Sequence, residues 1–481
     1  MNGKKKIYLA LALFLSVVLV FGIWFMFDNK ENTLNDNDNN NYYIAAFIDG
    51  EASTTFPTTK DYIADVTCKK GSVEVNIGAK VAWTGTKWKL SVDDASVSDV
   101  ACNIRFVTKP TWSSPGTGTL LAAIKRDNTV KSPTTTPGTE ASSSTEALLA
   151  STADDYGMSY YFRGAVTNNF VEYANMCWRI VRVTGDGSIK LVLYNYNGLT
   201  SANNTPFSST PCNVTDEDLA FARYKGDTYT SEFNSSYNDN AYVGLMYGTA
   251  GASSYEDAQA NTNPSTILTN LNKWYTNVLS KQANFNDNQL ADTIWCNDKQ
   301  VVTDTTFNPI NFTLGTNYGY AKNKNYYSSS KRLMQASSAK AGGTGPSLVC
   351  PNDNNGGKLS KFTACDTDYG NGDLNEYAKI GLVTADEIAY AGGGSYTSNL
   401  TYYLKGNTNS TMWWALSPGG FDGSAFVWGV SDSSGNLGYN GLVNVIVSSN
   451  YRVRPSLSLV ASTKIISGSG TASNPYRIAM Q

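Results

Sequence analysis

An uncharged apolar run near the N-terminus constrains this chain more than any other feature. Residues Ile7 to Phe27 read IYLALALFLSVVLVFGIWFMF and follow the basic start MNGKKK. An apolar helix of this length crosses a hydrocarbon core of about 30 Å. Lys4 to Lys6 form the cationic flank that stays in the cytoplasm. The sequence therefore predicts a cytoplasmic tail at 1–6, a transmembrane helix at 7–27 and an extracellular remainder.

A cleaved signal peptide is the alternative for the same run. The run is longer than the usual apolar region of a signal peptide, and bulky Trp24, Phe25 and Phe27 stand where a small-residue cleavage site is needed. We therefore expect an uncleaved anchor. The chain is then a single-pass protein of the cell membrane with a C-terminal extracellular ectodomain.

Seven cysteines in an exported chain predict disulfide bonds. No two of them form a C-x-x-C pair, so their spacing gives no sign of a metal site. Cys68 and Cys102 fall in one small predicted domain, and we expect them to pair. Cys350 with Cys365 would close a local loop. Because the number of cysteines is odd, one of them has no partner within the chain. It is an unpaired buried thiol, a link between chains or a reactive thiolate. Pairings stay open among Cys177, Cys212, Cys296, Cys350 and Cys365.

The chain contains no histidine, which limits the chemistry that it can perform. Histidine is the commonest general base, the partner of catalytic serine and cysteine, and a frequent metal ligand. The enzyme mechanisms that remain need carboxylates alone or a metal ion. With a formal net charge of -3, the chain also has no excess of positive charge that would indicate a nucleic-acid partner. We therefore expect a protein that binds and does not catalyse.

Changes in composition divide the predicted ectodomain into modules that are mainly β with minor α. Residues 28–41 are polar and predict a flexible stalk. Residues 42–108 alternate in short apolar segments between turns, which predicts a small disulfide-stapled β-sandwich of the immunoglobulin-like kind. Residues 109–155 are rich in Ser, Thr and Pro and predict a linker, with short helices at LLAAIK and EALLAS. Residues 156–481 form one large domain.

Three local patterns in the large domain specify secondary structure. The segment Trp178 to Gly198 alternates on both sides of Gly-Asp-Gly and predicts a hairpin. The segment STILTNLNKWYTNVL has an apolar stripe at helical spacing and Ser265 as N-cap. Thr384 and Glu387 form a capping box that begins a second helix. Neighbours on a helix point about 100° apart, so Asp386 and Glu387 are not expected to act as paired carboxylates in glycoside cleavage.

The order of several motifs resembles a family of bacterial surface proteins. The motifs are SYYFRGAVTNNFVEYANMCWRIVRVTGDGSIKL, IWCND, IGLVTADEIAYAGG, WWALSPGG, YRVRPSLSL and GSGTASNPYRI. The pattern W-W-x-x-S-P followed by V-R-P-x-L resembles the DUF6273 domain of membrane-anchored proteins from gut Gram-positive and related bacteria. The resemblance covers Tyr156 to Ile478, and residues 42–108 are similar to modules that often precede this domain. It implies a cell-surface setting and a C-type-lectin-like fold, similar to that of the formylglycine-generating enzymes.

The same resemblance supplies no enzymatic activity to expect of this chain. The family has no established activity that could be transferred to this chain. Formylglycine-generating enzymes need a catalytic cysteine arrangement, and the stretch similar to them is mainly Trp413 to Leu459. No cysteine follows Cys365 in this chain, so that arrangement has no match.

Aromatic residues near the C-terminus are the candidate ligand contacts. Trp413 and Trp414 are neighbours on a predicted strand and must point to opposite faces, so at most one can stack on a ligand. Core packing is the alternative for both rings. The segment from Gly419 to Asn450 mixes aromatic rings with Gly, Ser and Asn, as binding loops do, and predicts exposed rings. The predicted contacts are Trp413, Phe421, Phe426, Trp428, Tyr439 and Tyr451.

One acidic loop, DTDYGNGD, is a candidate calcium site. Asp366, Asp368, Asn371 and Asp373 carry side-chain oxygens close enough in sequence to share a calcium ion. The order departs from the EF-hand loop, because Gly370 stands where a ligand is expected. A solvated loop without a metal ion is the alternative.

Together these patterns predict a display protein with an anchor, a stalk, a β spacer and a distal lectin-like domain that binds an extracellular glycan or protein. Two alternatives stay open. In one, the chain is a passive envelope component whose Tyr- and Asn-rich surface associates with copies of itself. In the other, it is a histidine-free enzyme that uses carboxylates or a metal ion, and a cleft with two carboxylates of raised pKa would favour that hypothesis.

Overall fold

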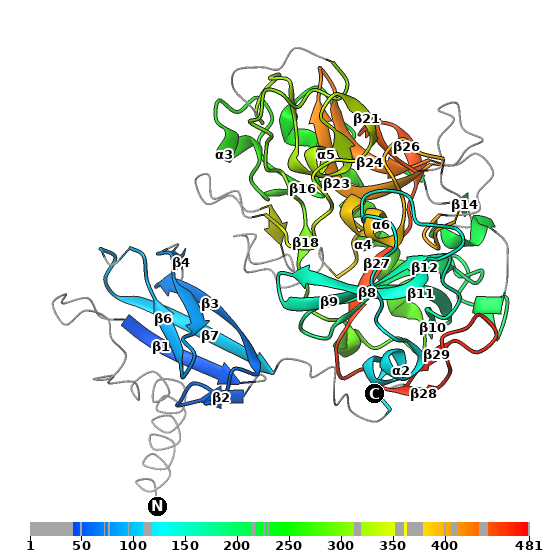
Figure 1. Cartoon of the computed structure of the whole chain (residues 1–481), viewed down its shortest axis with the longest axis horizontal. Coiled ribbons are helices and arrows are strands. Elements are labelled where there is room, and N and C mark those ends of the chain that lie inside the picture. Colours follow the sequence, from blue (N-terminus) through cyan, green and yellow to red (C-terminus); the bar gives the residue numbers. More distant parts are fainter. Residues whose placement is uncertain are drawn as a thin grey trace, which may run out of the picture. The chain divides into compact units, whose positions relative to one another are not determined.

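The computed structural model describes two units of the chain, and each is mainly β (Figure 1). Contacts divide the chain into Met1–Pro110 and Thr111–Gln481. Within the described residues, no helix is both long and apolar enough to cross a membrane. The apolar run 7–27 and the stalk 28–41 lie outside the described residues. The described residues are 42–48, 51–71, 73–75, 77–94, 96–108, 118–213, 217–224, 227–228, 230–311, 319–351, 360–362, 379–398, 401–405, 412–431 and 441–479.

The small unit contains a five-stranded sheet and a separate two-stranded hairpin. The sheet has the order β2-β1-β7-β3-β4, in which β1 runs parallel to β7 and β3 runs antiparallel to it. The hairpin is formed by β5 and β6. The strands are β1 (Tyr42–Ile48), β2 (Glu51–Ser53), β3 (Tyr62–Lys70), β4 (Val73–Glu74), β5 (Lys80–Trp83), β6 (Trp88–Ser91) and β7 (Val100–Thr108).

The hairpin of the small unit shares a core with the sheet. Alternation along β6 buries Trp88 and Leu90 and leaves Lys89 and Ser91 exposed. The Trp88 ring packs edge-on against Phe106 of β7, with 5.3 Å between the ring centroids. The unit is therefore built from two packed β layers, as a small sandwich is.

The predicted disulfide between Cys68 and Cys102 is confirmed. The two residues face each other in register on the neighbouring strands β3 and β7. In an immunoglobulin domain the disulfide joins the two sheets. The bond in this chain lies within one sheet, so it differs from the immunoglobulin pattern in this respect.

Replacing both Cys68 and Cys102 by alanine is expected to destabilise the small unit by about 2 to 4 kcal/mol, because the bond restricts the unfolded chain. Urea unfolding followed by hydrogen exchange of the β3 and β7 amides measures this change. The amides of the large unit serve as the internal control, since its own disulfides are untouched. Unchanged protection of β3 and β7 would contradict the prediction.

The large unit contains two sheets, and one helix contacts both of them. The first sheet has eight strands in the order β27-β12-β11-β10-β29-β28, with β9 on β11 and β8 on β9. The second has six strands in the order β15-β26-β23-β24-β25, with β19 on β23. Helix α6 (Ala385–Ala391) contacts β9 of the first sheet and β23 of the second, so it lies between them (Figure 1).

The strands of the first sheet are β8 (Ala147–Asp154), β9 (Gly157–Gly164), β10 (Phe170–Tyr173), β11 (Met176–Val183), β12 (Ile189–Asn195), β27 (Ser456–Leu459), β28 (Ile465–Ser467) and β29 (Tyr476–Ile478). Those of the second sheet are β15 (Thr230–Glu232), β19 (Asn325–Tyr326), β23 (Trp413–Phe421), β24 (Ala425–Val430), β25 (Leu442–Ile446) and β26 (Asn450–Arg452).

Short elements complete the large unit. The two-residue and four-residue strands pair as β13 (Arg223–Tyr224) with β14 (Asp227–Thr228), β16 (Met246–Tyr247) with β17 (Asn263–Pro264), β18 (Trp295–Cys296) with β22 (Lys361–Phe362), and β20 (Met334–Gln335) with β21 (Ser338–Ala341). The other α-helices are α2 (Leu120–Asp127), α3 (Tyr255–Ala258), α4 (Thr266–Asn277) and α5 (Ser328–Leu333). The 3-10 helices are η1 (Pro211–Asn213), η2 (Glu217–Ala220), η3 (Asn240–Tyr242), η4 (Leu279–Lys281) and η5 (Asp287–Gln289).

The three local predictions for the large unit are confirmed. Strands β11 and β12 form the predicted hairpin, and Gly187 in its turn has a φ of 87°, which glycine adopts without strain. Helix α4 begins after Ser265, whose side chain accepts a hydrogen bond from the Leu268 amide. Helix α6 begins at the capping box of Thr384 and Glu387.

The linker predicted at 109–155 is wrong for the residues from 118 onward. Helix α2 buries Leu120 and Ile124 in the core of the large unit. Most of the segment EALLAS, expected as a helix, lies in strand β8, which pairs along its whole length with β9. The intervening Ser- and Thr-rich residues are tied to the carboxylate of Glu146 by backbone and hydroxyl donors. The folded domain therefore begins well before Tyr156.

The local Cys350–Cys365 pairing is also wrong. Cys350 pairs with Cys296, and Cys177 pairs with Cys212. Strand β18 carries Cys296, while Cys350 ends a loop that follows β21, so the partners are distant in sequence and adjacent in the fold. Cys365 lies outside the described residues.

Candidate functional site

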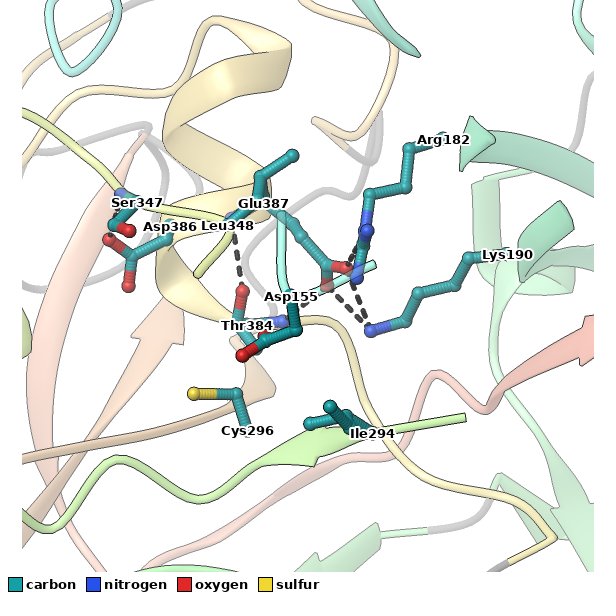
Figure 2. Close-up of a pocket in the computed structure, with 10 residues that line it drawn as sticks. All are labelled: Asp155, Arg182, Lys190, Ile294, Cys296, Ser347, Leu348, Thr384, Asp386 and Glu387. Atoms are coloured by element: carbon teal, nitrogen blue, oxygen red, sulfur yellow. Dashed lines mark hydrogen bonds and ion pairs between the residues drawn. The ribbon is translucent and has the colours of Figure 1, made fainter. Parts of the chain in front are cut away.

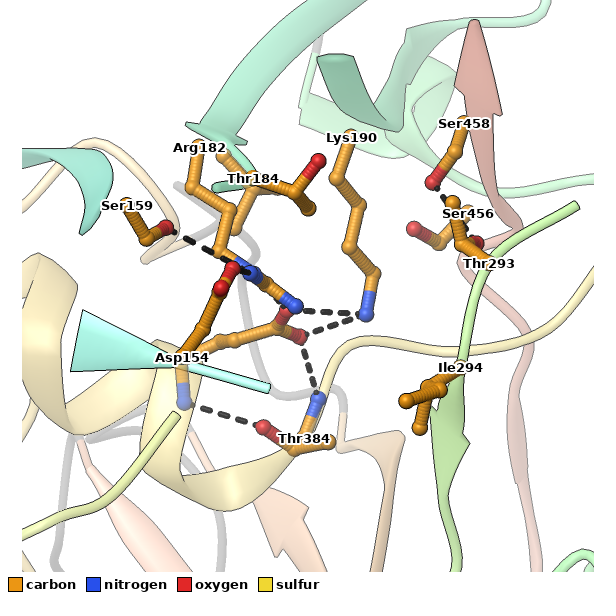
Figure 3. A network of polar contacts seen from close by, with 12 residues as sticks. Asp154, Ser159, Arg182, Thr184, Lys190, Thr293, Ile294, Thr384, Ser456 and Ser458 are labelled. Carbon is orange, nitrogen blue, oxygen red and sulfur yellow. Dashed lines mark hydrogen bonds and ion pairs between the residues drawn. The ribbon is translucent and has the colours of Figure 1, made fainter. Parts of the chain in front are cut away.

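A cluster of buried charges lies where α6 meets the first sheet (Figure 3). Arg182 comes from β11, Lys190 from β12 and Glu387 from α6. Arg182 donates to Asp154 Oδ2 over 2.5 Å and to Glu387 Oε1 over 2.9 Å. Lys190 donates to both carboxylate oxygens of Glu387, over 2.9 and 2.7 Å. The two cations and the two carboxylates neutralise one another.

Glu387 performs two tasks at the start of α6. Its side chain accepts a hydrogen bond from the Thr384 amide over 2.9 Å, and its own amide donates to Thr384 Oγ1 over 3.0 Å. This capping box satisfies amides at the helix N-terminus, where a negative charge is also favourable. The same carboxylate then holds Arg182 and Lys190. The cluster therefore couples the position of α6 to the β11–β12 hairpin.

The charged groups of this cluster shift one another's pKa values. Burial alone would raise the pKa of Glu387, but the charges of Lys190 and Arg182 outweigh burial and hold this pKa at about 2. Burial lowers the pKa of Lys190, against the attraction of Glu387. Burial also acts to lower the pKa of Arg182, but Glu387 and Asp154 raise it. At neutral pH Glu387 is therefore a carboxylate with no proton to donate.

A second buried carboxylate, Glu146, is held in a similar way. Its side chain and that of Arg163 are both fully buried and lie 3.1 Å apart. Burial acts to raise the pKa of Glu146, whereas hydrogen bonds from Thr135 and Ser142 and the charge of Arg163 lower it to about 2. Arg163 also donates to the carbonyls of Ala389 and Tyr390 at the end of α6. The pair thus attaches the residues before β8 to that helix.

Acid is expected to unfold the large unit because of these two carboxylates. Glu146 and Glu387 have a pKa of about 2 in the folded chain, below the value of about 4.3 in an unfolded chain. Their contribution to stability is complete above about pH 4.3 and is lost as the pH falls towards 2. Urea unfolding at a series of pH values measures the loss. Stability that does not change from about pH 5 to about pH 2.5 would contradict this prediction.

A separate ion cluster holds Asp386. Arg332 of α5 donates to Asp386 over 2.6 Å and to Asp298 over 2.5 Å. The Ser347 amide donates to the same Asp386 oxygen over 2.9 Å. Asp386 and Glu387 therefore bind different cations on different sides of α6, as the helix geometry predicted. They do not form the facing pair that glycoside cleavage needs.

A small pocket lies between these two clusters (Figure 2). The Cys296–Cys350 disulfide fixes one wall, and the Cys350 amide donates to Asp155 Oδ2 over 2.9 Å. The ionised groups of Arg182, Lys190 and Glu387 meet one another at one side of the pocket in Figure 2. The lining residues are Asp155, Arg182, Lys190, Ile294, Cys296, Ser347, Leu348, Thr384, Asp386 and Glu387.

No metal centre is found in the part of the chain that the structure describes. There, no group of three or more His, Cys, Asp or Glu side chains is arranged to hold a metal ion. The predicted calcium loop lies outside the described residues. Its four residues are Asp366, Asp368, Asn371 and Asp373.

Both tryptophans of WWALSPGG are core residues. Trp414 donates its Nε1–H to the Ser231 carbonyl over 2.7 Å and is fully buried. Trp413 is 1% exposed and lies with its ring centroid 5.2 Å from the guanidinium of buried Arg454. Both faces of β23 are covered, so each ring has a protein surface to pack against. The core alternative therefore holds for Trp413 as well as Trp414, and the predicted ligand contact at Trp413 is wrong.

Two further predicted contacts, Phe421 and Trp428, are also wrong, because both side chains are fully buried. Trp428 donates its Nε1–H to Ser329 Oγ over 3.0 Å, since α5 covers this part of the second sheet. Phe426 and Tyr451 are partly exposed. Tyr439 lies outside the described residues.

Two aromatic side chains are exposed among the described residues of the large unit, and neither is one of the predicted ligand contacts. Tyr237 is 46% exposed and Phe207 is 71% exposed. Phe207 packs edge-on against Tyr196, at 6.3 Å between the ring centroids. Neither ring stands in a periodic strand or helix, so no pattern in the sequence marks it as exposed.

Comparison with known proteins adds no assignment, because no family model, no curated protein and no solved structure matches this chain.

Proposed function

We propose that this chain is a membrane-anchored extracellular protein whose large unit binds a ligand without catalysis. Three disulfides among the described residues suit an extracellular or secreted protein, because such bonds persist in oxidising surroundings. In this proposal the apolar run 7–27 is the single-pass anchor and residues 28–41 are the stalk. The proposal includes a C-type-lectin-like fold for the large unit, which the order of its motifs implies.

The ion pairs of the buried carboxylates are the main support for a protein that binds its ligand without catalysis. A general acid needs a carboxyl group whose pKa is raised towards neutrality. Glu387 has the opposite shift, to about 2, and its charge is fully engaged by cations. Burial raises the pKa of Glu172, against the attraction of Arg477, but Glu172 lies on β10 and forms an ion pair with that arginine. The charged clusters therefore serve to hold the scaffold.

The proposed ligand contacts lie in the second sheet, at the partly exposed rings of the segment that the sequence marked for binding. Phe426 on β24 and Tyr451 on β26 are partly exposed residues. Tyr451 also packs edge-on against Trp414, at 5.1 Å between the ring centroids. A partly exposed aromatic residue held by its neighbours suits ligand contact, because little conformational entropy is lost on binding.

A binding screen of the ectodomain, residues 42–481, tests the proposal. The soluble ectodomain is applied to arrays of glycans and of surface proteins, once with calcium and once with a chelator. Selective, saturable binding supports a receptor role, and its loss with the chelator would assign calcium to the acidic loop at 366–373. The absence of binding in both conditions would contradict the proposal and favour a self-associating envelope protein.

A further inference from the structure

The three disulfides of the described residues differ in their surroundings. Cys68 and Cys102 belong to a buried apolar cluster of the small unit. Cys177 and Cys212 belong to another such cluster, beside Phe170 in the large unit. None of these four cysteines is more than 4% exposed. Burial therefore shields both bonds from a thiol in solution while the fold is intact.

The third disulfide, between Cys296 and Cys350, lies at the small pocket. Cys296 is partly exposed and is one of the residues that line this pocket in Figure 2. In the part of the chain that the structure describes, neither Cys296 nor Cys350 belongs to a buried apolar cluster. Val349, the neighbour of Cys350, is 46% exposed. Thiol–disulfide exchange needs access to one sulfur atom, so this bond is the most open of the three to attack by a thiol.

The Cys296–Cys350 bond holds a segment that forms part of the pocket wall. Ser347 and Leu348 of this segment line the pocket. The Ser347 amide donates to Asp386 Oδ1 in α6, and the distance is 2.9 Å. The Cys350 amide donates to a carboxylate at the other end of the segment. The disulfide therefore keeps this wall against the helix that carries the charge cluster.

Apart from the disulfide, the segment 342–350 is held by few contacts. It forms neither a helix nor a regular strand, and Leu348 joins the first sheet through an isolated bridge to Asp154. Leu348 and Cys350 are its only buried residues. A segment with so little buried apolar surface and so few backbone hydrogen bonds opens at a low free energy. Without the disulfide, the segment can therefore open while the two sheets stay folded.

We propose that the Cys296–Cys350 disulfide is a redox-sensitive latch on the pocket wall. The thiolate of a small thiol attacks Cys296 Sγ, the sulfur–sulfur bond breaks, and Cys350 leaves as a thiolate. A second thiolate attacks the mixed disulfide, which frees the Cys296 thiolate and forms the disulfide of the reagent. Two thiols are thus oxidised and one protein disulfide is reduced.

Opening of the latch exposes the pocket. The wall at Ser347 and Leu348 moves away, and solvent reaches the ionised groups of Lys190 and Glu387 that line the same pocket. Oxidising surroundings keep the latch closed, and a thiol reductant opens it. The latch goes beyond the proposed binding function and does not depend on it.

Graded reduction of the native ectodomain, residues 42–481, tests the access of a thiol to this bond. Any free thiol is first blocked with one alkylating reagent. The chain is then incubated with reduced glutathione, and the new thiols are labelled with a second, isotopically distinct reagent and identified by peptide mass spectrometry. We expect Cys296 and Cys350 to be labelled at least about tenfold faster than the cysteines of the other two disulfides. In urea the fold no longer protects any bond, so the three should be reduced at similar rates.

Hydrogen exchange of the selectively reduced chain tests the latch itself. We expect faster exchange at the Ser347 and Cys350 amides and unchanged exchange in β11 and β12. The double variant Cys296→Ser/Cys350→Ser should show the same pattern without a reductant. The matched control is Cys68→Ser/Cys102→Ser, which removes a disulfide from the small unit and should leave exchange at the two amides unchanged.

Three other outcomes would overturn the latch. Equal labelling of the three disulfides in the native chain would show that Cys296 has no special access. Selective reduction with unchanged exchange at Ser347 and Cys350 would show that the wall is held without the bond. Fast exchange throughout β11 and β12 after selective reduction would show that the bond supports the whole unit. Because this last test uses the reduced natural chain, it holds even where the serine variant does not fold.

Discussion

Replacing Glu387 by glutamine is expected to destabilise the large unit by about 3 to 5 kcal/mol. The substitution keeps the shape of the side chain but leaves Arg182 without one of its two carboxylates and Lys190 without its carboxylate partner in the cluster. Both cations are buried, so the lost pairing is not replaced by water. The substitution also weakens the capping box at the start of α6. Urea unfolding of the ectodomain, with the free energy extrapolated to zero urea, measures the effect.

The matched control is Asp287→Asn, which makes the same change from a carboxylate to an amide at the surface. Asp287 pairs with Lys379, and its side chain is 45% exposed. Exposed ion pairs contribute about 0 to 1 kcal/mol, so we expect a correspondingly small change. A Glu387→Gln effect as small as that of the control would contradict the structural role assigned to the charge cluster.

A chain that begins at Tyr156 is expected not to fold its large unit. Such a truncation removes β8, which pairs along its length with β9, and it removes helix α2 from the core. It also removes Glu146 and Asp154, so that Arg163 and Arg182 lose carboxylate partners in the buried interior. Removal of one partner from a single buried pair costs about 3 to 5 kcal/mol, and a typical domain has only about 5 to 15 kcal/mol in total.

A chain of residues 118–481 is the matched control for this truncation, because it retains α2, β8 and both carboxylates. We expect it to unfold cooperatively in urea, with well-dispersed amide resonances before the transition. The chain 156–481 should show neither property. Cooperative unfolding of that shorter chain would show that residues 118–155 are a linker after all.

The elements that could be predicted from the sequence are those with a local cause. The β11–β12 hairpin follows from alternation around a glycine-containing turn, and the starts of α4 and α6 follow from capping residues. The divergence of Asp386 and Glu387 follows from helix geometry alone. In each case the deciding interactions lie within a few residues of one another, so the sequence order already specifies them.

The misassigned segments depend on contacts that are distant in sequence. Residues 118–155 have the composition of a linker, but strand β9 and the buried pair of Glu146 with Arg163 hold them in the fold. Cys296 and Cys350 are 54 residues apart and meet through the fold. Composition and spacing alone do not show which distant residues will contact one another.

The charge cluster could not be predicted for the same reason. Arg182 and Glu387 are 205 residues apart in the sequence, and Lys190 and Glu387 are 197 residues apart. Alternation on an isolated hairpin would place the charged side chains of β11 and β12 in water, but both faces of these strands are covered. The aromatic residues present the same difficulty. Trp428 is buried and bonded to Ser329 of α5, whereas Phe426, two residues earlier on the same strand, is partly exposed.

The proposed function requires that the ectodomain bind its ligand and leave it chemically unchanged. The most direct measurement is equilibrium binding of the array-selected ligand to the ectodomain 42–481, followed by mass spectrometry of the ligand recovered after prolonged incubation. We expect saturable binding, weakened by Phe426→Ala, and recovery of the ligand unchanged. Cleaved or modified ligand that accumulates in proportion to protein and time would contradict it and establish a histidine-free enzyme.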